Sequence, residues 1–176
     1  MASIAESDIF IAAMRRAATS VSVVATSGPA GRLAVTVSAI ASVSAEPPIM
    51  LACINRRSPV CHAIRVNGVF TVSLLTSIQV PVAETFAGRR GDFAPFDFAC
   101  ADWHDIGDPG VPCLSHALSA FHCHMHHAYD AGTHTIVLGR VSEAIGRDAM
   151  PLIYTDRTYA APHPIPDHLM ITEMHP

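Results

Sequence analysis

Five histidines and one cysteine lie close together in the stretch FHCHMHHAYDAGTH, residues 121–134. On a strand, side chains two residues apart share a face, so His122, His124 and His126 would form one row. Three imidazoles in a row have the geometry to hold a divalent metal ion. Catalytic zinc, however, gathers its ligands from separated elements, and no carboxylate here completes a recognisable ligand pattern. We therefore predict no metal site at these three histidines.

The same alternation has an ordinary structural explanation, which we prefer. Cys123 and Met125 would point into the core, and the three histidines would lie on a partly solvated strand face. His134 differs from them because it follows a turn at Gly132 and begins the next strand. A side chain there is held firmly and can still reach an open groove. His134 therefore remains a candidate functional residue.

A second candidate site lies where the segment CINRRSPVCHAIR passes from a predicted strand into a predicted helix. Free backbone N–H groups and the positive end of the helix dipole favour an anion at such a junction. The residues at the junction are Asn55, Arg56, Arg57 and Ser58. An ordinary capped helix with solvated arginines would give the same pattern. The pair Arg89 and Arg90 is a second source of positive charge, so a phosphate site stays open at this point.

Several common chemistries lack their motifs in this chain. There is no Gly-x-Gly-x-x-Gly after a strand and no Gly-x-x-x-x-Gly-Lys-Ser/Thr loop, so Rossmann and P-loop nucleotide binding are disfavoured. There is no Gly-x-Ser-x-Gly elbow and no cysteine in a recognisable protease context. Any nucleotide must therefore bind by another architecture, and nucleophilic hydrolysis is disfavoured.

The elements that must position these residues belong to one compact domain. The chain has 176 residues, 50% hydrophobic and 15% charged, with a net charge of −4 and no basic run, which disfavours nucleic acid. Its apolar runs are too short for a membrane helix, and the N-terminus lacks a secretory signal, so we expect a cytoplasmic protein. We expect a single domain over 1–176, with its core at about 10–160 and a tail at 161–176.

An odd number of cysteines without a Cys-x-x-Cys pair disfavours disulfides and a zinc ribbon. They are expected to be reduced, buried and hydrophobic in behaviour. The five are Cys53, Cys61, Cys100, Cys113 and Cys123.

Period-two alternation and β-branched residues predict a mainly β fold. The strands are expected over residues 21–27, 32–45, 48–55, 69–75, 117–130, 134–145 and 151–155. Residues 89–113, which include the single tryptophan, form a turn-rich segment that we expect to be mobile. Many short strands with few helices favour one antiparallel barrel or sandwich.

Three short helices complete the prediction. The first is capped by Ser7 and is expected to turn its apolar residues inward. The second begins with Ser58 as N-cap and Pro59 at its first position, and ends at Asn67-Gly68. The third ends at Gly88, with Pro81 in its first turn or at a kink.

Four segments together resemble the short-chain flavin reductase family: AVTVSAIASVSAEPPIMLACINRRSP, HAIRVNGVFTVSLL, AETFAG and YDAGTHTIVLGRV. The likeness covers about residues 10–160. It implies an FMN-binding split β-barrel with antiparallel Greek-key connections that works as a homodimer. It further implies that the protein oxidises NADH or NADPH, reduces exchangeable FMN or FAD, and passes the reduced flavin to a partner monooxygenase, commonly an aromatic hydroxylase.

The resemblance also implies a flavin site made of three segments. One strand would face the isoalloxazine and ribityl groups, the next strand and the helix start would take the ring edge and the phosphate, and a third segment would close over the phosphate. In this order the residues are Thr36, Val37, Ser38 and Ala39; Cys53, Ile54, Asn55, Ser58 and Pro59; and Ala87, Gly88 and Arg89. Without the resemblance, Thr36 and Ser38 would be interpreted as the exposed polar face of a strand.

The nicotinamide side of the site is implied at His134, which falls in the Gly-Asp-His position of the family. Here the motif is Gly132-Thr133-His134, so the usual aspartate is replaced by threonine. Tyr159, in the C-terminal segment TDRTYAAP, and Pro47 are further predicted neighbours of the nicotinamide. His134 is expected to position a ring and not to transfer a proton.

The implied reaction is hydride transfer from the nicotinamide to the flavin, which needs stacked rings with reacting atoms about 3 to 3.5 Å apart. The cofactors supply the chemistry, and the protein supplies orientation. Two other classes stay open: a flavoprotein oxidase or flavin carrier on the same barrel, and a His-rich metal-binding protein. Oxidation of NADH with free flavin separates the first from a reductase, and metal content identifies the second.

Overall fold

The computed structural model describes residues 4–89 and 91–165. In chain order the elements are α1 (Ile4–Met14), β1 (Thr19–Ser20), β2 (Ser22–Thr26), β3 (Leu33–Val37), β4 (Ile40–Ala45), β5 (Pro48–Asn55), α2 (Pro59–Asn67), β6 (Val69–Leu74), α3 (Val80–Phe86), the 3-10 helix η1 (Phe98–Cys100), β7 (Trp103–Ile106), β8 (Val111–Leu114), β9 (Ser119–Ala131), β10 (His134–Gly146), β11 (Ile153–Thr155) and β12 (Thr158–Ala160). Within the described ranges, no helix is long and apolar enough to span a bilayer.

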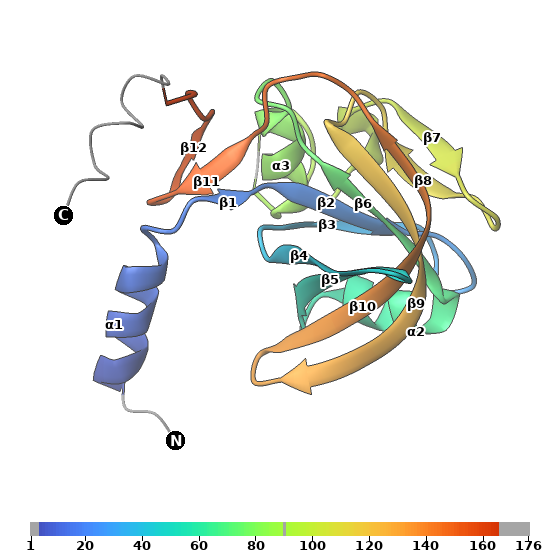
Figure 1. Ribbon diagram of the computed structural model, residues 1–176, viewed down its shortest axis with the longest axis horizontal. Coiled ribbons are helices and arrows are strands. Elements are labelled where there is room, and N and C mark those ends of the chain that lie inside the picture. The colour runs from blue at the N-terminus through green and yellow to red at the C-terminus, as the bar shows by residue number, and fades with distance from the viewer. Residues whose placement is uncertain (1–3, 90, 166–176) are drawn as a thin grey trace.

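One antiparallel sheet of seven strands forms the body of the molecule, in the order β3-β2-β6-β9-β10-β5-β4 (Figure 1). Its two edge strands, β3 and β4, are consecutive in the chain and are joined only by Ser38 and Ala39. The sheet must therefore curve until its edges approach each other. At this corner the Cys53 amide of β5 donates a hydrogen bond of 2.9 Å to the Ala39 carbonyl. The result is an open, rolled sheet, consistent with the predicted split β-barrel.

The division at Ser38–Ala39 corrects the single strand predicted over residues 32–45. The alternating pattern runs through the whole segment, but its two halves pair with different partners. β3 pairs with β2, and β4 pairs with β5. The chain therefore changes direction between them, and this turn puts Ser38 and Ala39 at a corner of the barrel.

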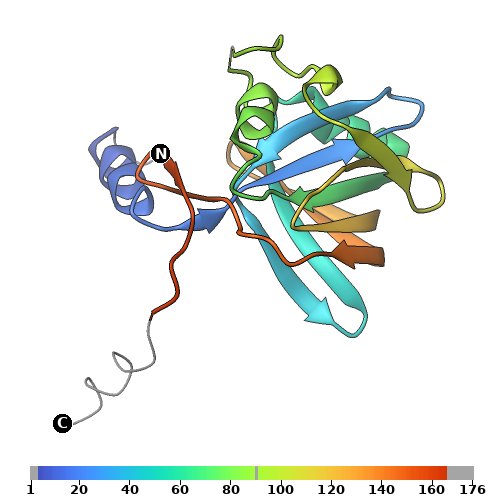
Figure 2. The same cartoon turned by 90° about the horizontal axis from the view of Figure 1, so that it is seen from above.

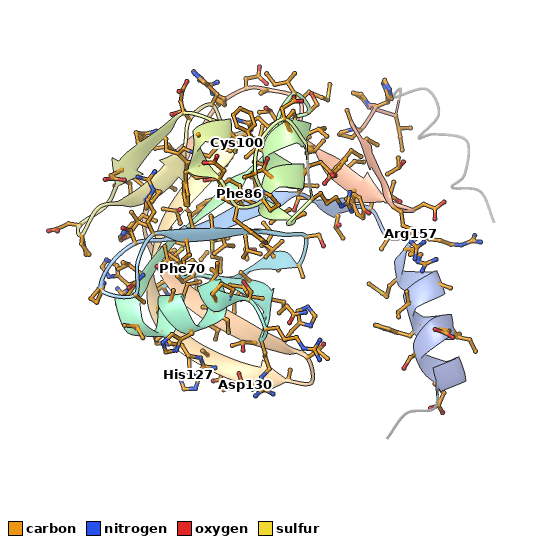
Figure 3. The ribbon with its side chains drawn as sticks, turned by 180° about the vertical axis from the view of Figure 1, so that it is seen from behind. Phe70, Phe86, Cys100, His127, Asp130 and Arg157 are labelled. Carbon is orange, nitrogen blue, oxygen red and sulfur yellow. The ribbon has the colours of Figure 1, made fainter. Side chains whose placement is uncertain are left out.

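Two apolar clusters hold the sheet and its helices together. The first includes Phe70 and Ile54 inside the roll and packs against α2 through Ile64. The second packs α3 against the other face through Phe86, whose ring meets that of Trp103 edge-on at a centroid distance of 5.5 Å. Both aromatic side chains, Phe70 and Phe86, point inward in Figure 3. The clusters leave the ends of β3 and β5 between α2 and α3.

The long hairpin of β9 and β10 breaks the predicted row of histidines. His127 pairs with Leu138 and Met125 with Gly139, so His126 is an extra residue at a bulge and the alternation shifts there. His122 is fully buried, which corrects the partly solvated face that we predicted for it. Cys123 is also buried, and burial raises the pKa of its thiol to about 12.

His122 is held by protein groups on both sides of its ring. Its Nδ1 lies 2.7 Å from the Ser142 hydroxyl, and its Nε2 lies 3.3 Å from the Pro109 carbonyl. Burial, together with the nearby His124, lowers the pKa of His122. The loop before β8 covers this ring: a side chain at Gly107 would collide with it. Among the described residues, no three histidine, cysteine or acidic side chains are grouped so that they could bind a metal.

Two parts of the fold differ from the sequence prediction. Residues 103–113, the second half of the segment 89–113 that was predicted to be turn-rich and mobile, form the β7–β8 hairpin together with Leu114. Helix α1 begins at Ile4, so Ser7 lies inside the helix and is not its cap. The helix projects away from the body (Figure 2), and Ile9 and Phe10 are 71% and 65% exposed. The apolar side chains expected to face inward therefore have no cover within one chain.

Candidate functional site

A cavity of about 150 Å³ lies between the end of β3, the end of α3 and the C-terminal strands. Five of the predicted flavin-binding residues line it, together with Tyr159, which was predicted on the nicotinamide side. The lining consists of Val21, Thr36, Val37, Ser38, Ala87, Arg89, Tyr154 and Tyr159. The fold thus brings together segments that are about fifty residues apart in the sequence.

The Thr36 side chain ties β3 to α3. Its hydroxyl donates a hydrogen bond of 2.8 Å to the carbonyl of Ala83, a fully buried helix residue. The prediction placed Thr36 against a flavin, but this bond gives its hydroxyl a structural role. Ser38 is exposed at the corner after β3, and its hydroxyl makes no hydrogen bond to a described residue. Ser38 is therefore the hydroxyl in this pair that is free to bind a ligand.

A network of charged and phenolic groups forms the polar wall of the cavity. Arg89 contacts Glu84 of α3 at 2.6 Å, and its pKa is raised chiefly by a hydrogen bond with Tyr154. Burial and a hydrogen bond with Glu84 raise the pKa of Tyr159. The Tyr154 and Tyr159 rings meet edge-on, with centroids 5.2 Å apart. The guanidinium group is therefore held in place at the cavity while half of its surface stays exposed.

Gly88 is required where α3 ends beside this network. Its φ is +75°, which favours glycine, and a Cβ there would lie 2.9 Å from the Phe96 ring. The Phe96 amide donates a hydrogen bond to the Thr85 carbonyl, so the segment after Arg89 folds back over the helix end. This packing fixes the direction in which the chain carries Arg89 toward the cavity.

A second group of predicted residues continues from the corner along β5. Cys53 lies next to Ala39, and Asn55 pairs with His134 of β10. The interior position between them, Ile54, is buried in the core, so its side chain is unavailable to a ligand. Asn55 and His134 are both exposed. Since residues two apart on a strand are about 6.6 Å apart, this pair lies within one small-molecule length of the corner.

The start of α2 follows directly on β5. Ser58 occupies the N-cap position and Pro59 the first turn, as predicted, but the Ser58 side chain makes no capping hydrogen bond. The Arg57 amide instead donates to the Asn55 side-chain oxygen at 2.9 Å. The Ser58 hydroxyl is therefore unused at the start of α2, where the sequence predicted an anion contact.

The basic side chains beside α2 are partly neutralised. Asp130 at the hairpin tip lies 2.8 Å from Arg65 and 3.5 Å from Arg56, and also accepts a hydrogen bond from Thr135. The Thr135 bond and the two guanidinium groups lower the pKa of Asp130. Figure 3 shows Asp130 and His127 at this tip, below the sheet. These contacts hold the tip that carries His134.

His134 has one polar neighbour in place of the aspartate of the family motif. The Thr133 hydroxyl lies 2.9 Å from its Nδ1, and the Thr133 carbonyl accepts a hydrogen bond from the Arg56 amide. The Nδ1 atom is thus engaged within the turn, and Nε2 is the atom left for a ligand. Pro47 is placed elsewhere: it lies in the β4–β5 turn, at the opposite end of β5 from Asn55. The structure does not bring Pro47 together with His134 within one chain.

The donor groups at the cavity fit part of a flavin nucleotide. A half-exposed guanidinium and an unengaged Ser38 hydroxyl are suited to hydroxyl and phosphate oxygens, and Val21 and Ala87 give an apolar wall. A volume of about 150 Å³ takes one portion of such a molecule. The remainder would lie along the exposed Asn55 and His134 edge.

Sequence reasoning missed Val21, Glu84 and Tyr154. Val21 and Tyr154 reach the cavity through the small sheet of β1, β11 and β12, in which Tyr154 pairs with Thr19. These short strands have too little alternation to predict their pairing. The acidic Glu84 lies on the helix five residues before Arg89, and that spacing is the one signal that could have identified it.

Comparisons with known proteins agree with this architecture. Residues 14–163 match the family model described as flavin reductase like domain. A protein of Variovorax paradoxus named FMN reductase (NADH) RutF is 38% identical over 158 residues, covering 86% of this chain and 85% of that protein.

Two solved structures are similar over most of their length. The bacterial protein BorF, the flavin reductase component of a two-component tryptophan halogenase, has 30% identity and a TM-score of 0.79, covering 88% of this chain and 97% of that one. The styrene monooxygenase flavin reductase of Pseudomonas putida S12 has 25% identity and a TM-score of 0.76, covering 89% and 98%. Because the family model spans most of the chain, this protein belongs to the flavin reductase like domain family.

Proposed function

We propose that this protein is an NADH-dependent flavin reductase that releases reduced flavin to a partner monooxygenase. The observation that carries the proposal is the meeting of Ser38, Ala87 and Arg89 around one cavity, next to the paired residues Asn55 and His134. NADH as the donor is supported by the relative named FMN reductase (NADH), and the partner by the two similar structures that belong to two-component systems.

In this mechanism the protein's own groups bind the flavin and orient the nicotinamide. Arg89 and the first amides of α2 neutralise phosphate charge, and Ser38 offers a hydroxyl to the polar part of the flavin. When bound, the flavin accepts a hydride from the nicotinamide. His134 positions the nicotinamide through Nε2, since its Nδ1 is engaged by Thr133. None of these side chains has to transfer a proton. Their effect on the rate of hydride transfer comes from how they place the two rings.

The exposed position of the site agrees with a flavin that comes and goes. Ser38, Asn55, Arg89 and His134 are all exposed, and the cavity encloses only part of a flavin. A ligand held over so little surface dissociates readily, as delivery to a second enzyme requires. We propose FMN or FAD as exchangeable substrates, and an oxygenase acting on an aromatic compound as the receiving partner.

We further propose that two copies of the chain associate. Helix α1 exposes Ile9 and Phe10 (Figure 2), and an apolar groove of about 410 Å³ lies beside Ser20, where the chain leaves the body toward α1. The groove wall includes Ile49 and Phe121. An apolar helix of a second copy is the occupant that matches it. Light scattering should give twice the chain mass, and Phe10→Glu should reduce it, whereas Val66→Glu on exposed α2 should not.

The function is tested by following NADH and NADPH consumption with FMN, FAD and riboflavin each added in turn. We expect NADH oxidation that depends on added flavin and exceeds the rate with NADPH. A protein that binds flavin but oxidises neither nucleotide would be a flavin carrier and would contradict the proposal.

A pair of variants tests the role of His134 in the same assay. His134→Ala should raise the KM for NADH about tenfold while flavin affinity changes less than twofold, because its free nitrogen makes one polar contact. His126→Ala, an exposed histidine at the bulge, is the matched control and should leave both values unchanged. Unaltered NADH kinetics in His134→Ala would remove His134 from the site.

A further inference from the structure

A large cavity in the described part of the chain is separate from the flavin site. It has a volume of about 660 Å³ and lies between the segment that leads into α3, the loop before β7 and the segment after β10. Cys100, labelled beside α3 in Figure 3, is on its wall. A cavity of this size is in the range that holds a small organic molecule. None of the residues assigned above to flavin or nicotinamide binding lines it.

One end of this cavity is positively charged. Arg147 and His116 line it, and the Arg147 guanidinium donates a hydrogen bond of 3.0 Å to His116 Nδ1. A neighbouring cavity of about 330 Å³ shares these two residues and Ser115, and adds His104, whose ring lies 3.2 Å from the Ser115 hydroxyl. No carboxylate lines that second cavity, so the place where the two cavities meet is suited to an anion.

Thr76 adds a buried hydroxyl to the wall of the large cavity. Thr76 lines the large cavity, is 5% exposed, and its hydroxyl oxygen has no hydrogen-bond partner among the described residues. A buried hydroxyl without a partner costs about 1 to 3 kcal/mol. The backbone amide of Thr76 is already satisfied by the Gln79 side chain at 3.0 Å, so the hydroxyl is the one unmatched polar group of this residue.

The rest of the wall is largely apolar and uncharged. Ile78, Val82 and Met150 line it, and burial raises the pKa of the Cys100 thiol, which keeps that group neutral. Asp102 is the one carboxylate among the lining residues; its carbonyl accepts a hydrogen bond from the Ser115 amide, and among the described residues no ion pair joins its side chain to Arg147. An apolar body with a single negative group at the Arg147 end matches this distribution.

We propose that this cavity binds a small organic monocarboxylate with a compact apolar body. Arg147 and His116 bind the carboxylate, the Thr76 hydroxyl donates to it or to a second polar group, and the apolar wall encloses the body. No residue lines both this site and the flavin cavity. Pro81 and Val82 of α3 line it, and the same helix reaches the flavin cavity through Ala87.

The test is calorimetric titration of the full-length protein with benzoate, with neutral benzamide and with acetate as probes. We expect saturable binding of benzoate, binding of benzamide that is about tenfold weaker or more because it lacks the charge, and no measurable binding of acetate because it lacks the apolar body. Equal affinities for benzoate and benzamide, or no binding of benzoate, would overturn the proposal.

Variants locate the site. Arg147→Gln should weaken benzoate binding about tenfold or more, and Arg140→Gln, an exposed arginine of β10 outside the cavity, should leave it unchanged. Thr76→Val removes the unpartnered hydroxyl at constant shape, so it should keep or raise the Tm of the free protein and reduce the rise in Tm that benzoate produces. Undiminished benzoate binding in both Arg147→Gln and Thr76→Val would place the ligand elsewhere and refute the assignment.

Discussion

The two hydroxyls at the end of β3 should have opposite roles, and this can be measured. Thr36 donates to the Ala83 carbonyl at 2.8 Å, whereas Ser38 is exposed and has no hydrogen bond to a described residue. Thr36→Val removes a hydroxyl at constant shape and breaks the bond between β3 and α3. Ser38→Ala removes an exposed hydroxyl that has no protein partner among the described residues. The first change should affect stability, and the second should affect flavin affinity.

The size of the stability effect follows from the contacts of Ala83. Its carbonyl also accepts the helical hydrogen bond from the Ala87 amide at 3.0 Å, so Thr36→Val leaves it with one partner. The loss is then one ordinary hydrogen bond, about 1 kcal/mol. For a chain of this length the Tm should fall by about 2 to 4 °C. Urea unfolding followed by circular dichroism measures the loss.

Flavin affinity is measured by titrating FMN or FAD with each variant and following flavin fluorescence. Thr36→Val should change the Kd less than about threefold, whereas Ser38→Ala should raise it by about three- to tenfold, the value of one hydrogen bond. Ser38→Ala should leave the free energy of unfolding within about 0.5 kcal/mol of the original. If Thr36→Val instead weakens flavin binding more than tenfold with unchanged stability, the Thr36 hydroxyl faces the ligand and the reasoning is wrong.

Three further outcomes are expected. Arg89→Gln should weaken flavin binding about tenfold, through loss of a charge-assisted hydrogen bond, with Arg140→Gln unchanged as the control in a fluorescence titration. Gly139→Ala would push a methyl group into a buried phenylalanine ring and should destabilise the protein by about 1 to 3 kcal/mol or more in urea unfolding, whereas Gly146→Ala, with 3.5 Å of room, should be nearly neutral. Burial and a neighbouring imidazole lower the pKa of His122, so the unfolded chain takes up its proton first as the pH falls below about 6.5. The free energy of unfolding should therefore decrease from pH 7 toward 5, and His122→Gln should show a smaller decrease.

The elements with strong local signals were predicted closely. β5 spans the predicted residues 48–55, and α2 lies between the predicted cap Ser58 and Gly68, whose φ of +74° needs glycine. In both cases the determining residues are neighbours in the sequence. The positions of His134 and Asn55 at strand ends followed from the same local patterns. Their pairing was not predicted, because it depends on contacts between distant segments.

The features that were not predicted depend on long-range packing. The corner at Ser38 arises because β3 and β4 find different partners, which alternation within one segment cannot reveal. The burial of His122 results from the β7–β8 hairpin folding over it, and α1 is exposed although its composition is that of a core helix. Tyr154 reaches the site through the pairing of β1, near the N-terminus, with β11, near the C-terminal end of the described chain. Each of these depends on surfaces that meet only after folding.

The open corner of the barrel also affects how readily the sheet opens locally. Elsewhere around the roll, neighbouring strands are fastened by ladders of backbone hydrogen bonds, but β3 and β4 share no ladder, and the bond from the Cys53 amide to Ala39 continues the β4–β5 ladder on one side of the gap. Local breathing needs the least free energy along such a line. The edges of β3 and β4 can therefore separate here while the remaining ladders stay intact, so the proposed exchange of flavin would not require the frame of the sheet to open.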